Sequence, residues 1–284
     1  MSQQLRVGFV GVGRMGSAML QCVLEAEYHA TLFDPSEAAT SPFLSKFPER
    51  VRVARSGREA SSESDVISIV VNTNEQLVAA CLGDDGVFAG ARPGCVVLIH
   101  STVNQETLRQ LGKVAEERGI QLLDAPVAGA KGQLSVGDLA VMVGGDKASF
   151  ERAKPIMETY GGLVVLLGPL GAGLDAKLAL NMFRYLCMIA GQEATALAEQ
   201  TSPGAGAAMS QLVSHAQANR YIGNNDRRAA FEKLPVAGRQ NDAELAQKDL
   251  RAAIARAAEV GMKLPSAELA LGLMHRVWFV EPRK

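Results

Sequence analysis

Short apolar runs alternate with segments of helical composition over the first 168 residues of the chain. The apolar runs predict β-strands at 5–10, 28–33, 51–54, 66–71, 95–99, 121–124, 139–143 and 163–167. The segments between most of these runs predict helices at 15–27, 35–47, 57–64, 75–82, 105–118 and 150–160. Strands and helices in alternation predict an α/β fold, with a doubly wound parallel sheet that carries helices on both faces.

The pattern changes after Gly168, where Pro169 and further glycines interrupt the chain. Beyond this point the composition is helical, with predicted helices at 175–199, 204–218, 242–260 and 265–277. We therefore expect two domains that are joined by a long helix. The α/β domain covers 1–168, and an all-α domain for substrate binding and oligomerisation covers 169–284.

A glycine motif lies directly after the first predicted strand and opens the first predicted helix. Gly11, Gly13 and Gly16 have the GxGxxG spacing, with Val12, Arg14 and Met15 between them. In this context the first glycine permits a tight turn, the second lets a pyrophosphate approach the backbone, and the third allows close packing of helix on strand. The helix N-terminus favours the phosphate charge. The motif predicts a Rossmann-type dinucleotide-binding domain, and the alternative is a plain glycine-rich turn.

An acidic residue, Asp34, ends the second predicted strand. An acid at this point of a Rossmann-type domain accepts hydrogen bonds from the adenosine ribose and repels a 2′-phosphate. The next residues, Pro35 and Ser36, are not basic. The sequence therefore favours NAD over NADP, although a turn aspartate before a proline would look the same.

The composition limits the classes of partner. The chain is 48% hydrophobic and 21% charged with a formal net charge of -1, so nothing suggests binding of nucleic acid or of an anionic membrane. No apolar run is long enough to span a bilayer. Four well-separated cysteines, without a CxxC pair, are typical of free thiols in a reducing compartment, and we expect a cytoplasmic protein. Neither the cysteines nor the histidines have the spacing of metal ligands, so no metal site is predicted.

With these features placed, the chain resembles the β-hydroxyacid dehydrogenase family, which includes 3-hydroxyisobutyrate dehydrogenase and tartronate semialdehyde reductase. The resemblance covers nearly the whole chain. Five stretches are similar to the family in order: 8–16 (GFVGVGRMG), 101–103 (STV), 123–127 (LDAPV) with 142–145 (MVGG), 171–173 (GAG) followed by Lys177 and Asn181, and 248–250 (KDL). The family reaction is the reversible oxidation of a small β-hydroxy acid to a semialdehyde or keto acid.

The resemblance also implies roles for single residues. It places Val71 and Asn72 on the nicotinamide side of the cleft, Thr102 against the cofactor, and Lys248 where it reaches or closes over the cofactor. It implies that Lys177 is the catalytic lysine and that Asn181 assists it. Substrate binding falls to the segment after Pro126-Val127, which consists of Ala128, Gly129 and Ala130.

Two departures from the family pattern bear on the substrate. The family usually has Ser-Gly-Gly where this chain has Ala128-Gly129-Ala130, so a hydroxyl is missing and a methyl group is added. The family usually has Asn immediately before the position of Asn181, where this chain has Leu180. These changes leave the fold and the cofactor unaffected but put the usual substrate in doubt.

Lys177 suits the chemistry that hydride transfer requires. When the cofactor accepts a hydride from a carbinol carbon, the protein must still remove the hydroxyl proton. The reference pKa of a lysine, about 10.4, is too high for a base, but burial or nearby positive charge lowers it. Apolar neighbours surround Lys177 on its predicted helix, which indicates burial rather than a surface lysine. Asn181 is four residues further and shares its face.

Arg184 falls on the same helix face, one further turn along. We expect it to bind the carboxylate of the substrate, and the alternative is an ion pair with an acid of the second domain. A long apolar helix also needs cover on every side, which suggests a homodimer or homotetramer.

Two other functions remain open from the sequence. One is reduction of imines on the same scaffold, although relatives with that activity tend to replace the catalytic lysine. The other is a dinucleotide-binding sensor that has lost turnover. The altered segment 128–130 is the observation that suggests it. The sequence names neither the hydroxy acid nor the physiological direction.

Overall fold

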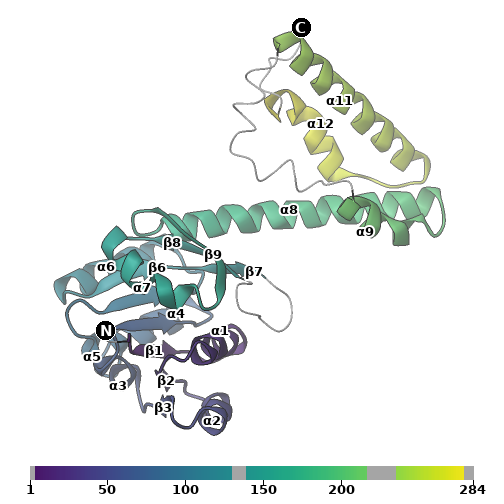
Figure 1. The fold of residues 1–284 in the computed structure, drawn as a ribbon. Coiled ribbons are helices and arrows are strands. Elements are labelled where there is room, and N and C mark those ends of the chain that lie inside the picture. The colour runs from purple at the N-terminus through teal and green to yellow at the C-terminus, as the bar shows by residue number, and fades with distance from the viewer. Residues whose placement is uncertain (1–3, 130–138, 216–234, 278–284) are drawn as a thin grey trace. The chain divides into compact units, whose positions relative to one another are not determined.

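The computed structural model describes residues 4–129, 139–215 and 235–277 (Figure 1). It divides into two units, Met1–Leu180 and Asn181–Lys284, and each is described here by itself. None of the helices in the described ranges is both long and apolar enough to cross a membrane.

A nine-stranded sheet forms the centre of the N-terminal unit, as far as the described residues show. Its strands follow the order β3-β2-β1-β4-β5-β6-β8-β7, and β9 pairs with β8. In chain order the strands are β1 (Val7–Val10), β2 (Ala30–Phe33), β3 (Val51–Val53), β4 (Val66–Ile69), β5 (Val96–Ile99), β6 (Gln121–Asp124), β7 (Val127–Gly129), β8 (Leu139–Gly144) and β9 (Gly161–Gly168). All neighbours from β3 to β6 are parallel, so their carboxyl ends meet at one edge.

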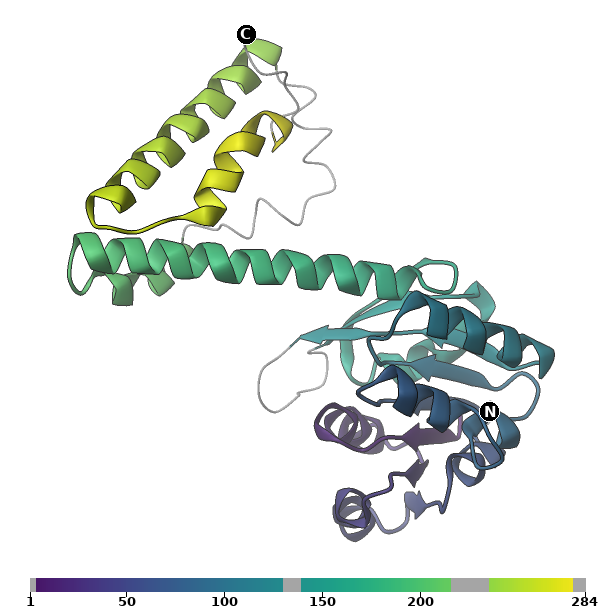
Figure 2. The ribbon, with the colours of Figure 1, turned by 180° about the vertical axis from the view of Figure 1, so that it is seen from behind.

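Helices connect these strands and lie along the sheet (Figures 1 and 2). They are α1 (Arg14–Glu25), α2 (Glu37–Lys46), α3 (Gly57–Ser62), α4 (Asn74–Cys81), α5 (Val87–Gly90), α6 (Gln105–Glu117) and α7 (Lys147–Met157). Most of them match the predicted helices within a few residues, and α3, α4, α6 and α7 each begin at a residue whose side chain accepts a hydrogen bond from the first turn. The short helix α5 and the short strand β7 were not predicted.

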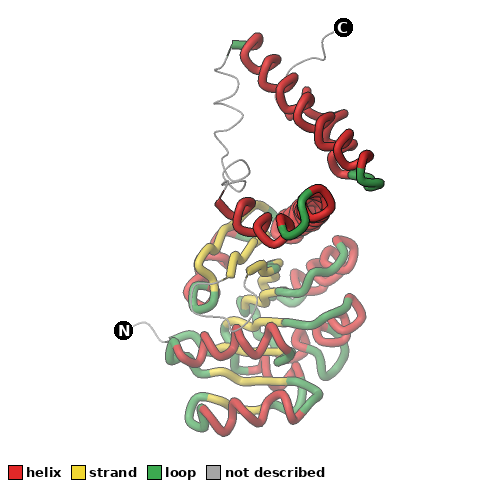
Figure 3. The backbone as a smooth tube through the Cα atoms, turned by 90° about the vertical axis from the view of Figure 1, so that its right-hand side faces the viewer, coloured by secondary structure: helices red, strands yellow, loops and turns green. Residues whose placement is uncertain are grey.

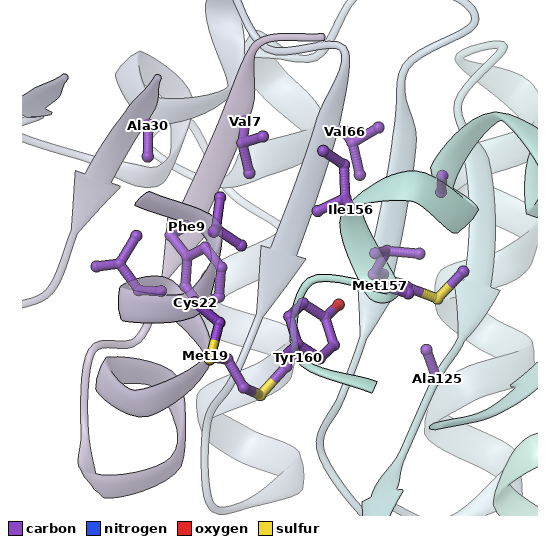
Figure 4. Close-up of a cluster of buried hydrophobic side chains, with 14 of the residues drawn as sticks. Val7, Phe9, Met19, Cys22, Ala30, Val66, Ala125, Ile156, Met157 and Tyr160 are labelled. Atoms are coloured by element: carbon purple, nitrogen blue, oxygen red, sulfur yellow. The ribbon is translucent and has the colours of Figure 1, made fainter. Parts of the chain in front are cut away.

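Successive side chains of the central strands pack into two separate cores. On one face, Val66 and its neighbours contact α1, α2 and α7, and Figure 4 shows Phe9, Met19 and Tyr160 in this cluster. On the other face, Ile67 and its neighbours contact α3, α4, α5 and α6. Strands buried on both faces in this way need continuous apolar runs, as the sequence has. Figure 3 shows the strands between the helical layers, so the predicted doubly wound fold is confirmed.

The sheet departs from the predicted parallel arrangement at β8. This strand is antiparallel to β6 and to β7, and it pairs with both along the same edge. A parallel connection needs a crossover of about a dozen residues or more, usually through a helix. The chain between β6 and β8 contains no predicted helix and uses part of its length for β7, so the sheet is parallel from β3 to β6 and between β8 and β9 but antiparallel where β8 meets β6 and β7.

Helices make up the described part of the C-terminal unit. They are the later part of α8 (Ala172–Thr201), then α9 (Ala205–His215), α11 (Val236–Glu259) and α12 (Pro265–Val277). The helices α11 and α12 lie side by side (Figure 1). The carboxylate of Glu193 on α8 accepts hydrogen bonds from the N–H and hydroxyl of Ser266, at the start of α12. The all-α character that was predicted after residue 168 is confirmed.

The two units divide inside α8, between Leu180 and Asn181. Residue 168, where the sequence places the domain boundary, is the point at which strands give way to helices. The first turns of α8 therefore pack with the α/β unit. The extent of each folding domain stays a prediction.

Candidate active site

The three glycines of the motif have different surroundings. Gly11 has φ +89°, and a Cβ atom there would overlap the carbonyl oxygen of Val70. A Cβ atom at Gly16 would overlap the carbonyl of Gly11, so this glycine lets α1 approach β1. No atom lies within 4 Å of the Cβ position at Gly13. The backbone at Gly13 is therefore open to an incoming group, as a pyrophosphate requires.

The N-terminus of α1 also suits an anion. Gly13 is the N-cap residue and supplies no side chain to the first N–H groups of the helix. The amides of Arg14, Met15 and Gly16 belong to the first turn, where a helix has no internal acceptors for its donors. Together with the helix dipole, these donors can bind phosphate oxygens.

A pocket of about 630 Å³ adjoins the motif. Its lining includes Gly13, Arg14, Asp34, Val71 and Asn72, all of which the sequence assigned to the cofactor. Dinucleotides bind at the carboxyl ends of the strands where the strand order reverses, and in this sheet that point lies between β1 and β4. The residues present thus fit a dinucleotide.

The carboxylate of Asp34 is fixed by the backbone. One oxygen accepts the N–H of Val12 at 2.7 Å, and the other accepts the N–H of Ser36 at 2.9 Å. The first bond ties the end of β2 to the glycine loop, and the second forms a local turn before α2. Asp34 is therefore both a turn residue and an acid that is held beside the pocket.

The loops after β4 and β5 are joined by Ser101, which is buried. Its hydroxyl accepts the N–H of Val71 at 3.0 Å and donates to the carbonyl of Val71 at 2.7 Å. Thr102 follows with an exposed side chain, next to the loop that carries Asn72. No role was predicted for Ser101, although it lies only two residues after an apolar strand.

A buried histidine, His100, contacts the backbone at the end of β6. Its Nδ1 lies 2.7 Å from the carbonyl oxygen of Ala125, and its Nε2 lies 3.3 Å from both the Ser68 hydroxyl and the Tyr160 hydroxyl. Since a carbonyl only accepts, Nδ1 carries the proton. Burial lowers the pKa of His100 to about 4, while the bond to Ala125 acts in the opposite direction. The neutral ring is thus a structural group, and no motif in the sequence points to it.

Lys177 lies on the second turn of α8 and is only 8% exposed. Its Nζ donates to the carbonyl oxygen of Val127 at 2.7 Å. This bond holds the amine against the segment that the sequence assigned to the substrate, where Ala128 is buried and Gly129 is exposed with φ +150°. The predicted burial of Lys177 is confirmed, and its catalytic role remains a prediction.

The described structure does not test the other predicted site residues. Asn181 is half-buried one turn after Lys177 on α8, within the C-terminal unit. Lys248 lies on α11 with its side chain 69% exposed, and its Nζ is 3.3 Å from Asp249 Oδ1. Ala130 and the side chain of Arg184 lie outside the described residues. The roles of these four residues stay predictions.

Comparison with known proteins agrees with this geometry. The family profile of the NAD binding domain of 6-phosphogluconate dehydrogenase matches residues 6–168. An uncharacterized oxidoreductase of Mycobacterium tuberculosis is 32% identical over 94% of this chain and 90% of its own length. The NAD-dependent L-serine dehydrogenase of Pseudomonas aeruginosa is 35% identical over 68% of this chain and 63% of its own length.

Solved structures extend the comparison to both units. The 3-hydroxyisobutyrate dehydrogenase of Mycobacterium tuberculosis with L-serine has a TM-score of 0.67 at 29% identity, covering 96% of this chain and 94% of that one. The imine reductase of Myxococcus stipitatus shares the fold, with a TM-score of 0.74 at 17% identity over 96% of this chain and 94% of that one. The glycine motif and the extent of these matches show that the chain belongs to the β-hydroxyacid dehydrogenase family of oxidoreductases.

Proposed function

We propose that this protein is an NAD-dependent dehydrogenase of a small β-hydroxy acid, with Lys177 as general acid and base. The observation that carries the proposal is the buried amine of Lys177, 2.7 Å from the carbonyl of Val127, in the same unit as the GxGxxG pocket. A buried lysine in the same unit as a dinucleotide pocket is a candidate functional group, because a lysine is ordinarily solvated.

The chain supplies proton transfer and orientation. The nicotinamide supplies the hydride acceptor or donor when NAD is bound. In the oxidative direction neutral Lys177 accepts the proton from the substrate hydroxyl, and in the reductive direction its ammonium form returns that proton to the same oxygen. The bond to Val127 orients the amine, and Asn181 holds either the amine or the hydroxyl.

The preference for NAD rests on Asp34. Its carboxylate is held beside the pocket by two backbone N–H groups, so it cannot easily turn away from a 2′-phosphate. Arg14 lines the same pocket and can pair with a phosphate oxygen. We assign Arg14 to the pyrophosphate because it belongs to the glycine loop itself.

The relatives and the site support the proposed substrate class. Two relatives are named for L-serine or 3-hydroxyisobutyrate, and both compounds are β-hydroxy acids. The carboxylate of such a substrate needs charge-assisted donors in a closed site. The N–H groups of Gly129 and Ala130, together with Arg184, are the donors that we propose. Ala128 leaves space for a substituent more apolar than the usual family substrate carries.

We also propose a homodimer or homotetramer. Among the described residues, five apolar side chains along α8 are about half exposed or more: Leu178 48%, Met182 62%, Tyr185 59%, Leu186 50% and Ile189 47%. Their spacing places them on one side of the helix. An apolar stripe of this kind is typical of a subunit interface. Light scattering of the wild type and of Met182→Lys tests this assignment.

The proposed function is tested by a spectrophotometric screen of small β-hydroxy acids with NAD and NADP, which detects the reduced cofactor. Lys177→Ala should lower turnover on a confirmed substrate by about 10²- to 10⁴-fold, the usual contribution of a general acid–base. Lys147→Ala, at an exposed position at the start of α7, is the control. Near-normal turnover of Lys177→Ala would refute the assigned role.

Imine reduction remains the second candidate, because an imine reductase shares the fold. The same screen should include a cyclic imine with NADPH. Oxidation of NADPH by the imine without activity on any hydroxy acid would favour this alternative. NAD binding without turnover of either class would favour the sensor.

A further inference from the structure

Asp124 is a buried carboxylate at the end of β6, with 1% of its surface exposed. It lies in the segment 123–127, which resembles the family's substrate region, but its carboxylate oxygens contact the start of α8. Oδ1 accepts the N–H of Gly171 at 2.6 Å, and Oδ2 accepts the N–H of Leu174 at 2.7 Å. Both amides belong to the start of α8.

These contacts satisfy backbone donors that have no partner within a helix. The first N–H groups of α8 point at Asp124, and a negative charge at this end of a helix is favourable. Burial raises the pKa of Asp124, whereas the bonds from Gly171 and Leu174 lower it. Asp124 is buried and each of its oxygens accepts a backbone N–H group, so its contacts are with the start of α8.

The surroundings of Asp124 leave no space for larger residues. A Cβ atom at Gly144 would overlap Asp124 Oδ1. A Cβ atom at Gly173 would overlap the carbonyl of Met142 and stand 2.9 Å from Asp124 Oδ2. Helix α8 therefore starts in close contact with β8 and with the carboxylate, and its axial position is closely determined.

The segment 124–127, which begins with Asp124, contacts α8 a second time. Val127, three residues after Asp124, accepts the hydrogen bond of Lys177, three residues after Leu174. The side chain of Asp124 thus holds the first turn of α8, and the carbonyl of Val127 holds Lys177 on the second turn. Gln105 adds a bond to the carbonyl of Gly171 from the start of α6.

We propose that Asp124 is a positioning residue, which sets the place of Lys177 by holding the first turn of α8. This inference rests on the proposed role of Lys177. A displacement of about 1 Å at a reacting group lowers rates by about 100-fold, so a helix that starts in a different place would lose catalysis while the dinucleotide pocket stays intact.

The variant that tests this is Asp124→Asn. The amide has nearly the same shape, but its oxygen can accept only one of the two N–H groups, and its own NH₂ faces the other. We expect kcat to fall by about 10- to 100-fold, while NAD affinity stays within a few-fold. Asp65→Asn is the matched control, because Asp65 also accepts a backbone N–H, that of Arg6, and lies at the amino end of β4.

A second readout does not depend on activity. Reductive methylation of the folded protein, followed by mass spectrometry, measures how accessible the amine of Lys177 is relative to that of exposed Lys147. Asp124→Asn should accelerate methylation of Lys177 several-fold, and Asp65→Asn should not. If methylation accelerates while Lys177→Ala proves fully active, Asp124 still positions Lys177 and only the proposed catalytic role has failed.

Gly173→Ala provides an independent displacement of the helix with the carboxylate retained. It should produce the same loss of kcat and the same exposure of Lys177. The proposal is overturned if Asp124→Asn matches Asp65→Asn in kcat and methylation, or if it loses NAD affinity together with kcat. Unfolding of both Asp124→Asn and Gly173→Ala would also overturn it, because Asp124 would then serve folding in general and not Lys177.

Discussion

The hydroxyl of Ser101 holds the backbone of Val71 through two hydrogen bonds, one accepted from the N–H at 3.0 Å and one donated to the carbonyl at 2.7 Å. Ser101 follows β5 and Val71 follows β4, so the bonds join two neighbouring loops at the carboxyl edge of the sheet. The family resemblance places Val71 on the nicotinamide side of the cleft and Thr102, next to Ser101, against the cofactor. The spacing between these loops is therefore fixed by one buried side chain.

Ser101→Ala should weaken NAD binding as well as stability. The change leaves both polar groups of Val71 without their partner, and an unsatisfied buried group costs about 1–3 kcal/mol. Ser61→Ala is the matched control, since the buried hydroxyl of Ser61 donates to the carbonyls of Arg58 and Val87, away from the pocket. Both variants should lower the melting temperature, but only Ser101→Ala should raise the Kd for NAD. Equal Kd values would show that the two loops are positioned by other contacts.

His100 should make the stability of the α/β unit depend on pH. Because burial lowers its pKa to about 4, against about 6.5 in an unfolded chain, the unfolded state takes up the proton first as the pH falls. The stabilisation is complete above pH 6.5 and is lost between pH 6.5 and 4, by about 3 kcal/mol.

Urea unfolding of wild type and His100→Gln across this range measures the contribution. The wild type should lose more stability than the variant as the pH decreases. His29→Gln, at an exposed position, is the control. If it flattens the dependence as much as His100→Gln does, the effect does not arise from His100.

These residues show which parts of the site could be predicted. The GxGxxG motif, Asp34 and Lys177 belong to local patterns, in which a strand, a turn and a helix follow one another in the sequence. His100, Ser101 and Asp124 act through partners about 25 to 50 positions away. Sequence spacing does not predict contacts between residues so far apart. The reversal at β8 was missed for a related reason, because an apolar run of this length fits a parallel or an antiparallel neighbour equally well.

Asp34 should make NAD at least about tenfold more efficient than NADP in kcat/KM, which corresponds to about 1.4 kcal/mol. Its carboxylate is held beside the pocket and would repel a 2′-phosphate. Asp34→Ser with Pro35→Arg should move the preference toward NADP. Glu37→Ser changes the next acid along the chain and serves as the control. Equal efficiency of the wild type with both cofactors would contradict this prediction.

Substitution by alanine should change NAD affinity at Gly13 and thermal stability at Gly16. The two variants therefore distinguish a role in cofactor binding from a role in folding. At Gly13 the backbone has φ −69°, which any residue adopts, and no atom lies within 4 Å of the Cβ position. Gly13→Ala should therefore fold with an unchanged melting temperature. Its methyl group would occupy the space that a pyrophosphate needs, so the Kd for NAD should rise by at least about tenfold, equivalent to 1.4 kcal/mol.

At Gly16 a Cβ atom would overlap the carbonyl of Gly11, where α1 packs against the loop. Gly16→Ala should lower the melting temperature, because a helix that is forced away from its strand loses buried contacts. Thermal unfolding and NAD titration of both variants decide the matter. If Gly13→Ala binds NAD like the wild type, the pyrophosphate does not approach this glycine, and the assignment of the motif to the dinucleotide would have to be abandoned.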